Sequence, residues 1–193
     1  GVGTHSYTAN NSSSGYGNYG TLTANFGATT YNYSLMPNSL SNYSTTAQID
    51  AIATLMYHCG VSVDMMYGSS GSGAYSQDVP YALRTYFSYP AEVQFVSKDN
   101  YTNENWKALI INELNNSRPV YYSGSGSGGH AFVCDGYNNN YFHINWGWRG
   151  SYNGYFLLSN LNPGDYNFNS DQGAVIGISA PNTNLPTVTT GSV

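Results

Sequence analysis

The stretch Gly128–Trp148 reads "GGHAFVCDGYNNNYFHINWGW" and sets two strand-like segments on either side of a run of asparagines. Apolar and polar residues alternate with a period of two over 130–137 and again over 141–146, which predicts two β-strands. Two or three of the asparagines at 138–140 are enough for the turn. The stretch therefore predicts a β-hairpin, and its open end carries a histidine, an asparagine and two tryptophans.

The length of the turn decides which residue faces His130. A two-residue turn at Asn138 and Asn139 places Gly147 opposite His130 and puts Asn145 on the same face of the sheet. A three-residue turn places Trp148 opposite His130 instead. Diagonal neighbours in a sheet lie about 7–8 Å apart, which is within reach of side chains.

In the first register, the Asn145 side-chain oxygen can accept the imidazole N–H of His130 and fix its tautomer, while Trp146 shields the pair from water. This arrangement is the base and its orienting partner in a Cys–His–Asn site. A histidine beside an asparagine can also be no more than a satisfied polar pair. His143 lies on the Asn145 face without the preceding glycines, and we expect it to be structural. His130 and His143 lack a convincing third ligand, so we expect no metal.

No cysteine of this chain is well placed to be the nucleophile. Cys59 follows a predicted helix at its C-terminal end, where the helix dipole disfavours a thiolate. Cys134 lies four residues beyond His130 on the same strand, about 13 Å away at roughly 3.3 Å per residue. We expect both to be free, half-buried thiols; a disulfide between them is the alternative. A serine of the segments 67–74 or 123–129 is an alternative, but these glycine-rich segments are more typical of loops along which a peptide backbone can lie.

The composition restricts the possible partners. The 193 residues suit one domain, only 8% of them are charged, and 5 Lys+Arg stand against 10 Asp+Glu, for a net charge of −5. Nucleic acids and anionic membrane surfaces require basic clusters, so neither is an expected partner. No apolar run approaches the roughly 18 residues of a membrane span, and we expect no signal peptide in the first residues of this sequence. We expect a domain over 1–180 and a linker over 181–193 that leads towards a further domain.

The order of elements predicts an α+β fold in which helices come first and a twisted antiparallel sheet follows. The first forty residues suggest short irregular strands and turns. A first helix is expected between a Ser/Thr cap and Gly60, and Thr102 can cap a third helix. Each helix is expected to bury its apolar stripe in the core. The expected helices cover 47–58, 76–87 and 103–116, and the further strands cover 119–124, 154–160 and 174–179.

The chain resembles the streptopain-like bacterial cysteine proteases, which have a papain-like fold. The resemblance rests on "GGHAFVCDGY" and "FHINWGW", extends to "LMYHCGVSVDMMYGSSGSGA", "ALRTYF", "WKALIINELNNSRPVYYSG" and "GYFLLSNLNP", and spans roughly residues 16–179. It implies a secreted or cell-surface endopeptidase that is made as a zymogen, needs no cofactor and cleaves protein or peptide substrates. It assigns His130 as general base, Asn145 as its orienting residue and Trp146 as cover. It also implies that Ser70, Gly71, Ser72, Gly129 and Trp148 contact the substrate.

The chain departs from this family in one respect. The family's nucleophilic cysteine lies in a Gly-Cys motif at the start of a helix, upstream of the segment that corresponds to Gly1. The resemblance therefore implies that His130 serves a cysteine outside this chain, and that an N-terminal segment with that cysteine and a propeptide are its partners. Two competing interpretations are a non-catalytic surface-binding module rich in Tyr, Asn and Gly, and a pseudoenzyme that has lost its nucleophile.

Overall fold

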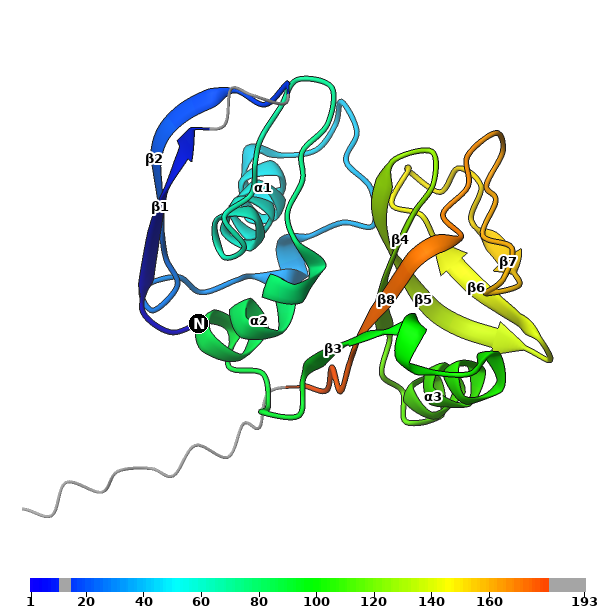
Figure 1. Cartoon of the computed structure of the whole chain (residues 1–193). Coiled ribbons are helices and arrows are strands. Elements are labelled where there is room, and N and C mark those ends of the chain that lie inside the picture. Colours follow the sequence, from blue (N-terminus) through cyan, green and yellow to red (C-terminus); the bar gives the residue numbers. More distant parts are fainter. Residues whose placement is uncertain (11–14, 181–193) are drawn as a thin grey trace, which may run out of the picture.

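The computed structural model describes residues 1–10 and 15–180, which form two lobes joined by extended segments (Figure 1). One lobe holds a two-stranded antiparallel sheet and two helices. The other holds a six-stranded antiparallel sheet of order β3-β8-β4-β5-β6-β7, with a third helix against it. The strands are β1 Thr4–Asn10, β2 Asn18–Asn25, β3 Gln94–Ser97, β4 Val120–Ser125, β5 Gly129–Asn138, β6 Tyr141–Asn145, β7 Gly154–Phe156 and β8 Ser170–Ile176. The α-helices are α1 Thr46–Val61, α2 Val79–Phe87 and α3 Asn103–Asn115, and the 3-10 turns are η2 Tyr33–Leu35, η3 Ser76–Asp78 and η4 Lys98–Asn100.

The first lobe is built around a small core beneath β1 and β2. Phe26 is fully buried at its centre, stacks on Tyr86 at 4.6 Å and packs against Val61 at the end of α1. Thr45 begins α1 with a capping box, since its side chain accepts from the backbone of Gln48 while the Gln48 side chain accepts from the Thr45 backbone. Such a box satisfies two of the backbone donors that a helix start leaves unpaired.

One face of α1 has no apolar cover among the described residues. Ile49 is 43% exposed and Met56 is 68% exposed, and Ala53 between them is exposed as well. Our expectation that this stripe is buried in the core is therefore wrong for the described part of the chain. The helix also continues through Gly60 to Val61, and a Cβ at Gly60 would collide with the Tyr67 hydroxyl. Gly60 thus serves a close approach of two segments rather than the helix end.

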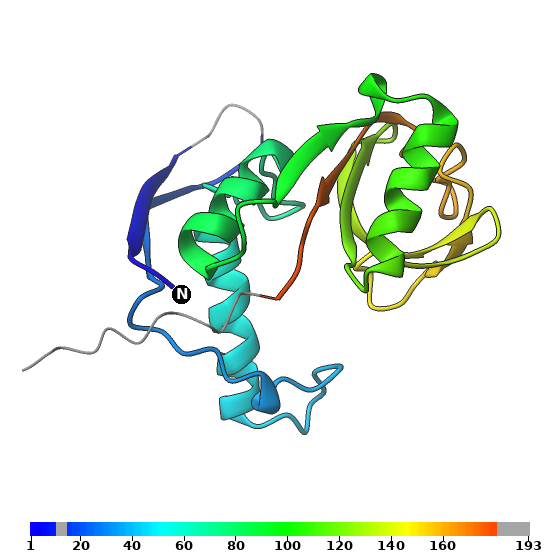
Figure 2. The same ribbon diagram turned by 90° about the horizontal axis from the view of Figure 1, so that it is seen from below.

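The second lobe buries α3 against one face of the six-stranded sheet (Figure 2). Trp106 and Ile110 of α3 are fully buried, as the apolar stripe predicts. The Trp106 indole N–H donates to the Tyr122 hydroxyl at 2.7 Å, and that hydroxyl donates to Gln172 Oε1 at 2.8 Å. This chain of bonds satisfies the polar atoms that α3, β4 and β8 bring into the core, where unpaired polar groups are costly.

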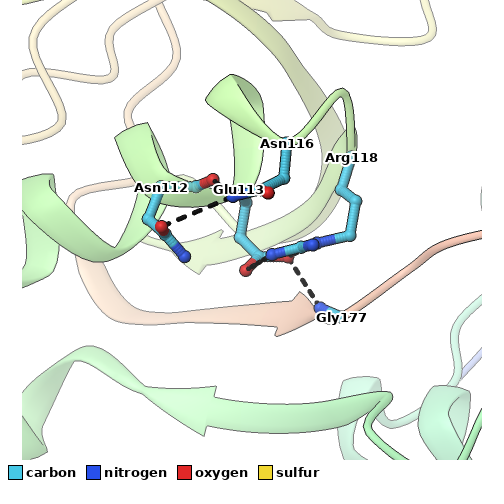
Figure 3. A network of polar contacts seen from close by, with 5 residues as sticks. All are labelled: Asn112, Glu113, Asn116, Arg118 and Gly177. Atoms are coloured by element: carbon cyan, nitrogen blue, oxygen red, sulfur yellow. Dashed lines mark hydrogen bonds and ion pairs between the residues drawn. The ribbon is translucent and has the colours of Figure 1, made fainter.

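Glu113, near the end of α3, forms a salt bridge with Arg118 and accepts a hydrogen bond from Gly177, directly after β8 (Figure 3). The buried Glu113 carboxylate accepts two hydrogen bonds from the Arg118 guanidinium, at 2.7 and 2.8 Å, and a third from the Gly177 N–H at 2.8 Å. The hydrogen bond from Arg118, helped by that from Gly177, keeps the pKa of Glu113 below its ordinary value although burial opposes this. The ionised Glu113 side chain therefore joins the C-terminal end of α3 to the residue that follows β8.

The α+β class and the single large antiparallel sheet were predicted correctly from the sequence. The third helix falls where expected, as do β4, β5 and β6. The second helix begins only at Val79, after the 3-10 turn η3, and the last strand covers 170–176 instead of 174–179. The strand β3 was not foreseen, the segment 154–160 forms a strand only as far as Phe156, and the first forty residues contain two regular paired strands. The expected linker at 181–193 lies outside the described residues. No helix among the described residues is long and apolar enough to span a membrane.

Candidate active site

The β5–β6 hairpin combines a two-residue turn with a bulge. The turn is at Asn139 and Asn140, and Asn138 pairs with Tyr141. This turn lies one residue later in the sequence than the two-residue turn that we expected at Asn138 and Asn139. The register then shifts at Asp135. The bulge adds one residue to β5. Between the bulge and His130, the strands therefore pair as they would after a three-residue turn, with Val133 opposite Asn145. Since a shift of one residue exchanges the faces of a strand, this bulge decides which side chains meet His130.

Asn145 lies on the opposite face of the sheet from His130. It pairs with the exposed Val133, whereas His130, Phe132 and Cys134 point towards the core. The predicted hydrogen bond between the Asn145 side chain and the His130 ring is therefore absent from the described structure, and that prediction is wrong. The physical reason is the bulge beside Gly136, and a glycine inside a strand is a signal for a bulge that our prediction did not use.

A backbone carbonyl holds the imidazole instead. His130 Nε2 lies 2.9 Å from the carbonyl oxygen of Trp146. A carbonyl oxygen can only accept, so Nε2 must carry the proton and Nδ1 of the neutral ring must carry the lone pair. No hydrogen bond to Nδ1 is found among the described residues. The half-buried ring is thus fixed in the tautomer that a general base needs.

Asn145 still acts on this carbonyl, from the other side of the peptide group. Its Oδ1 accepts from the Gly147 N–H at 3.0 Å. That N–H and the Trp146 carbonyl belong to the same planar trans peptide, and so they point in opposite directions. Asn153 accepts from the Trp146 N–H at 3.0 Å and fixes the preceding peptide. Two asparagines therefore aim the carbonyl at His130, and Asn153 was missed because nothing in its local sequence marks it.

Aromatic rings enclose the His130 ring. Trp148 is nearest, stacked with its centroid 4.8 Å away and its plane inclined by 24°. Phe168 lies at 5.2 Å, Phe132 at 5.9 Å and Trp146 at 6.4 Å. Trp146 is fully buried, and its indole N–H has no hydrogen-bond partner among the described residues, so packing alone holds this ring. Trp146 thus contributes its carbonyl as well as cover, and the closer cover comes from Trp148.

Neither cysteine of the chain is paired with His130. Both are free, but Cys134 is fully buried and Cys59 is exposed, so our expectation of half-buried thiols is wrong for each. Burial raises the pKa of Cys134 to about 12. Cys59 lies in the last turn of α1 in the other lobe, where neighbouring protein atoms raise the pKa of its thiol by desolvation. Both environments oppose a reactive thiolate, which a cysteine nucleophile requires.

The glycine-rich segments place no serine on the imidazole. The Ser125 hydroxyl donates to Asp171 Oδ2 at 2.5 Å, and the Ser127 hydroxyl accepts from Asn167 at 3.1 Å. The predicted substrate residues Ser70, Gly71 and Ser72 are exposed in the loop closed by the Met66–Gly73 bridge, with no bond to His130. The two other predicted substrate residues do meet the histidine, since Gly129 precedes it along β5 and Trp148 stacks on it.

His143 has a separate partner on the outer face of the sheet. Its Nδ1 lies 2.5 Å from Asp135 Oδ1, and its ring packs on Tyr155. His130 and His143 therefore point to opposite faces and cannot share an ion. No cluster of three or more metal-binding side chains occurs in residues 1–10 and 15–180.

The architecture and this site define a class, the papain-fold cysteine proteases. The chain belongs to the peptidase C10 family, whose model matches residues 1–156. It is similar to the active interpain A cysteine protease of Prevotella intermedia, with a TM-score of 0.81 and 41% identity, covering 90% of this chain and 73% of that one. A prointerpain A fragment with a cysteine-to-alanine substitution matches with a TM-score of 0.78 and 40% identity, covering 92% and 56%.

The curated relatives are longer proteins. The thiol protease/hemagglutinin PrtT of Porphyromonas gingivalis is 41% identical over 166 residues, which are 81% of this chain and 19% of PrtT. Streptopain of Streptococcus pyogenes is 37% identical over 187 residues, which are 92% of this chain and 47% of streptopain. The chain thus spans about half of streptopain and a fifth of PrtT. These relatives confirm the predicted resemblance to streptopain-like cysteine proteases.

Proposed function

We propose that this chain is the larger part of a secreted bacterial cysteine endopeptidase in which His130 is the general base. The proposal is carried by the hydrogen bond from His130 Nε2 to the Trp146 carbonyl, because it leaves Nδ1 as a directed proton acceptor. The stacked Trp148 ring and the buried Trp146 ring exclude water from this bond. A base held in one tautomer and one orientation is what nucleophilic catalysis by a cysteine requires.

The nucleophile in this proposal is a cysteine upstream of Gly1. The absence of a suitable thiol among Cys59 and Cys134 supports it, because the sequence contains no other cysteine. The exposed apolar face of α1, with Ile49 and Met56, is the kind of surface that a further helix would cover, since folded chains seldom leave large apolar patches open. The names of the relatives, among them a thiol protease, point the same way.

The reaction then proceeds in two stages. His130 Nδ1 takes the thiol proton, the sulfur attacks the scissile carbonyl carbon, and the C–N bond breaks as the imidazolium returns that proton to the leaving nitrogen. His130 Nδ1 then takes a proton from water, whose oxygen attacks the thioester carbon; the C–S bond breaks, the acyl group leaves as a carboxylic acid, and the imidazolium returns the proton to the sulfur. The loops at Ser70–Ser72 and Gly129 are proposed to contact the substrate backbone. A propeptide is proposed by analogy with prointerpain A.

An assay of three proteins tests the proposal. The proteins are this chain, the chain with its upstream residues restored, and the restored form carrying His130→Ala. We expect hydrolysis of casein only by the second, with inhibition by an epoxide reagent for cysteine proteases. Thiol-dependent turnover by the 193-residue chain would make Cys59 or Cys134 the nucleophile. A restored form that folds but cleaves nothing would instead favour the pseudoenzyme or the binding module.

A further inference from the structure

Three aromatic side chains form a continuous surface that begins at His130. Trp148 stacks on the imidazole, and the Tyr166 and Tyr152 rings lie 5.3 and 6.2 Å from the Trp148 ring. Tyr152 is 56% exposed and Tyr166 is 49% exposed. We call Trp148, Tyr152 and Tyr166 the aromatic shelf. Its distal half is open to solvent although it consists of large rings.

The position of Tyr152 is maintained at a conformational cost. Its backbone has φ +60°, in the left-handed region that glycine occupies far more readily than a residue with a side chain. Gly164 faces it, and a Cβ on Gly164 would come within 2.9 Å of the Tyr152 ring. The Tyr152 ring stays more than half exposed, so that packing covers only part of it. Strain that is kept at an exposed side chain beside a site is an indication of function.

The shelf is also preformed. Tyr166 stacks on the buried Phe168, whose N–H donates to the Leu161 carbonyl at 3.0 Å. The loop that carries Tyr152 is fastened through Asn153, which holds the Trp146 N–H. Both tyrosines are therefore anchored to the core that surrounds His130, so that little ordering is needed when a ligand binds.

We propose that the aromatic shelf binds the side chain of the first substrate residue on the leaving-group side and selects aromatic or large aliphatic residues there. The inference rests on the proposed function and adds its specificity. An imidazole that returns a proton to the leaving nitrogen must contact the residue that carries this nitrogen. Trp148 lies against that imidazole, and the two tyrosines extend its surface outward. Aromatic pairs contribute beyond their buried area, which gives a ring preference.

Binding to the chain itself provides the first test and needs no catalysis. Phenylalanyl-alanine amide and glycyl-alanine amide mimic the leaving product, and NMR titration follows the Trp148 and Tyr166 ring signals. We expect the phenylalanyl amide to saturate at an about fivefold lower concentration. Tyr152→Gly removes the ring and suits the positive φ, so that it should abolish most of the preference without unfolding the chain. Tyr152→Phe should keep the preference, as should Tyr43→Ala, which removes an exposed ring in the other lobe.

The restored enzyme provides the second test. The ratio of kcat/KM for peptides with Phe over peptides with Gly after the scissile bond should fall about fivefold in Tyr152→Gly. The proposed role of the aromatic shelf is wrong if the two amides saturate at the same concentration, or if Tyr152→Gly leaves the preference intact. This holds whether or not the restored enzyme cleaves peptides. A preference for the phenylalanyl amide without any turnover by the restored enzyme would leave the shelf standing and defeat the proposed function alone.

Discussion

His130 Nε2 lies 2.9 Å from the carbonyl oxygen of Trp146, and the N–H of that same peptide group is held by Asn145 Oδ1 at 3.0 Å. The asparagine and the histidine are thus connected through a planar peptide whose two ends point in opposite directions. Each hydrogen bond polarises the other, and either one alone would leave the peptide freer to tilt. We therefore expect Asn145 to act as a positioning residue from the far face of the sheet.

Replacing Asn145 by alanine should weaken the orientation of His130 without abolishing it. One hydrogen bond of this kind contributes about 0.5–1.5 kcal/mol, which corresponds to a loss of roughly two- to thirteenfold in kcat of the restored enzyme. His130→Ala should cost several orders of magnitude. Asn145→Asp retains an oxygen that accepts from Gly147 and should recover most of the loss. The measurement is the pH profile of kcat/KM together with ¹⁵N NMR of the His130 tautomer.

Two outcomes would contradict this role. A loss in Asn145→Ala as large as that in His130→Ala would mean that the asparagine contacts the imidazole directly during turnover. An unchanged tautomer population and an unchanged kcat would mean that the Trp146 carbonyl keeps its direction without help. Val133→Ala, on the same exposed face and paired with Asn145 across the sheet, is the matched control.

The sequence was sufficient to predict the large helices and strands and the residues that surround the site. It was not sufficient to predict which face of a strand or helix each side chain occupies. Period-two alternation locates β4, β5 and β6, and the Thr102 cap locates α3, because these signals are local. The pairing of Asn145 with His130 failed because the bulge at Asp135 reverses faces, and a bulge depends on the partner strand. The exposed stripe of α1 failed for a related reason, since a helical period indicates an apolar face without indicating what covers it.

The two thiols should react slowly and by different routes. Cys59 is exposed, so a thiol reagent can reach it, but its raised pKa keeps the thiolate scarce near pH 6. Its labelling rate should rise about tenfold for each pH unit below that pKa, because only the thiolate attacks. Cys134 should be labelled only when the second lobe opens, since it is fully buried. Mass spectrometry of the folded chain and of Cys59→Ser separates them, and rapid labelling of Cys59 at pH 6 would refute this prediction.

His58 should make the first lobe sensitive to acid. Its buried ring has Nδ1 2.7 Å from the Tyr31 hydroxyl, and burial lowers the pKa of this histidine below the ordinary value of about 6.5. Because the folded pKa is the lower one, its contribution to stability is present above about pH 6.5 and is lost as the pH falls towards the folded pKa.

His58→Gln cannot take up this proton, so that its free energy of unfolding should fall less between pH 7 and pH 5 than that of the native chain. At pH 7 the variant should be less stable by about 1 kcal/mol through imperfect packing. Urea titrations at the two pH values measure both effects, with His143→Gln in the other lobe as control. An equal fall in His58→Gln and in the native chain would assign the acid sensitivity to another group.

Glu113 should set a second acid limit, in the second lobe. Its pKa is lowered chiefly by the hydrogen bond from Arg118, so that its stabilising effect is present above the ordinary value of about 4.5 and is lost as the pH falls through the lower folded value. Glu113→Gln leaves the guanidinium without its charge partner, and we expect a loss of about 2 kcal/mol in the free energy of unfolding at pH 7. The difference between this variant and the native chain should shrink below pH 4.5, because the native carboxyl is then protonated as well.

Glu92→Gln, at an exposed glutamate outside this network, should change little at either pH. A Glu113→Gln deficit that stays constant down to pH 3 would show that shape, and not the charge of Glu113, joins α3 to β8.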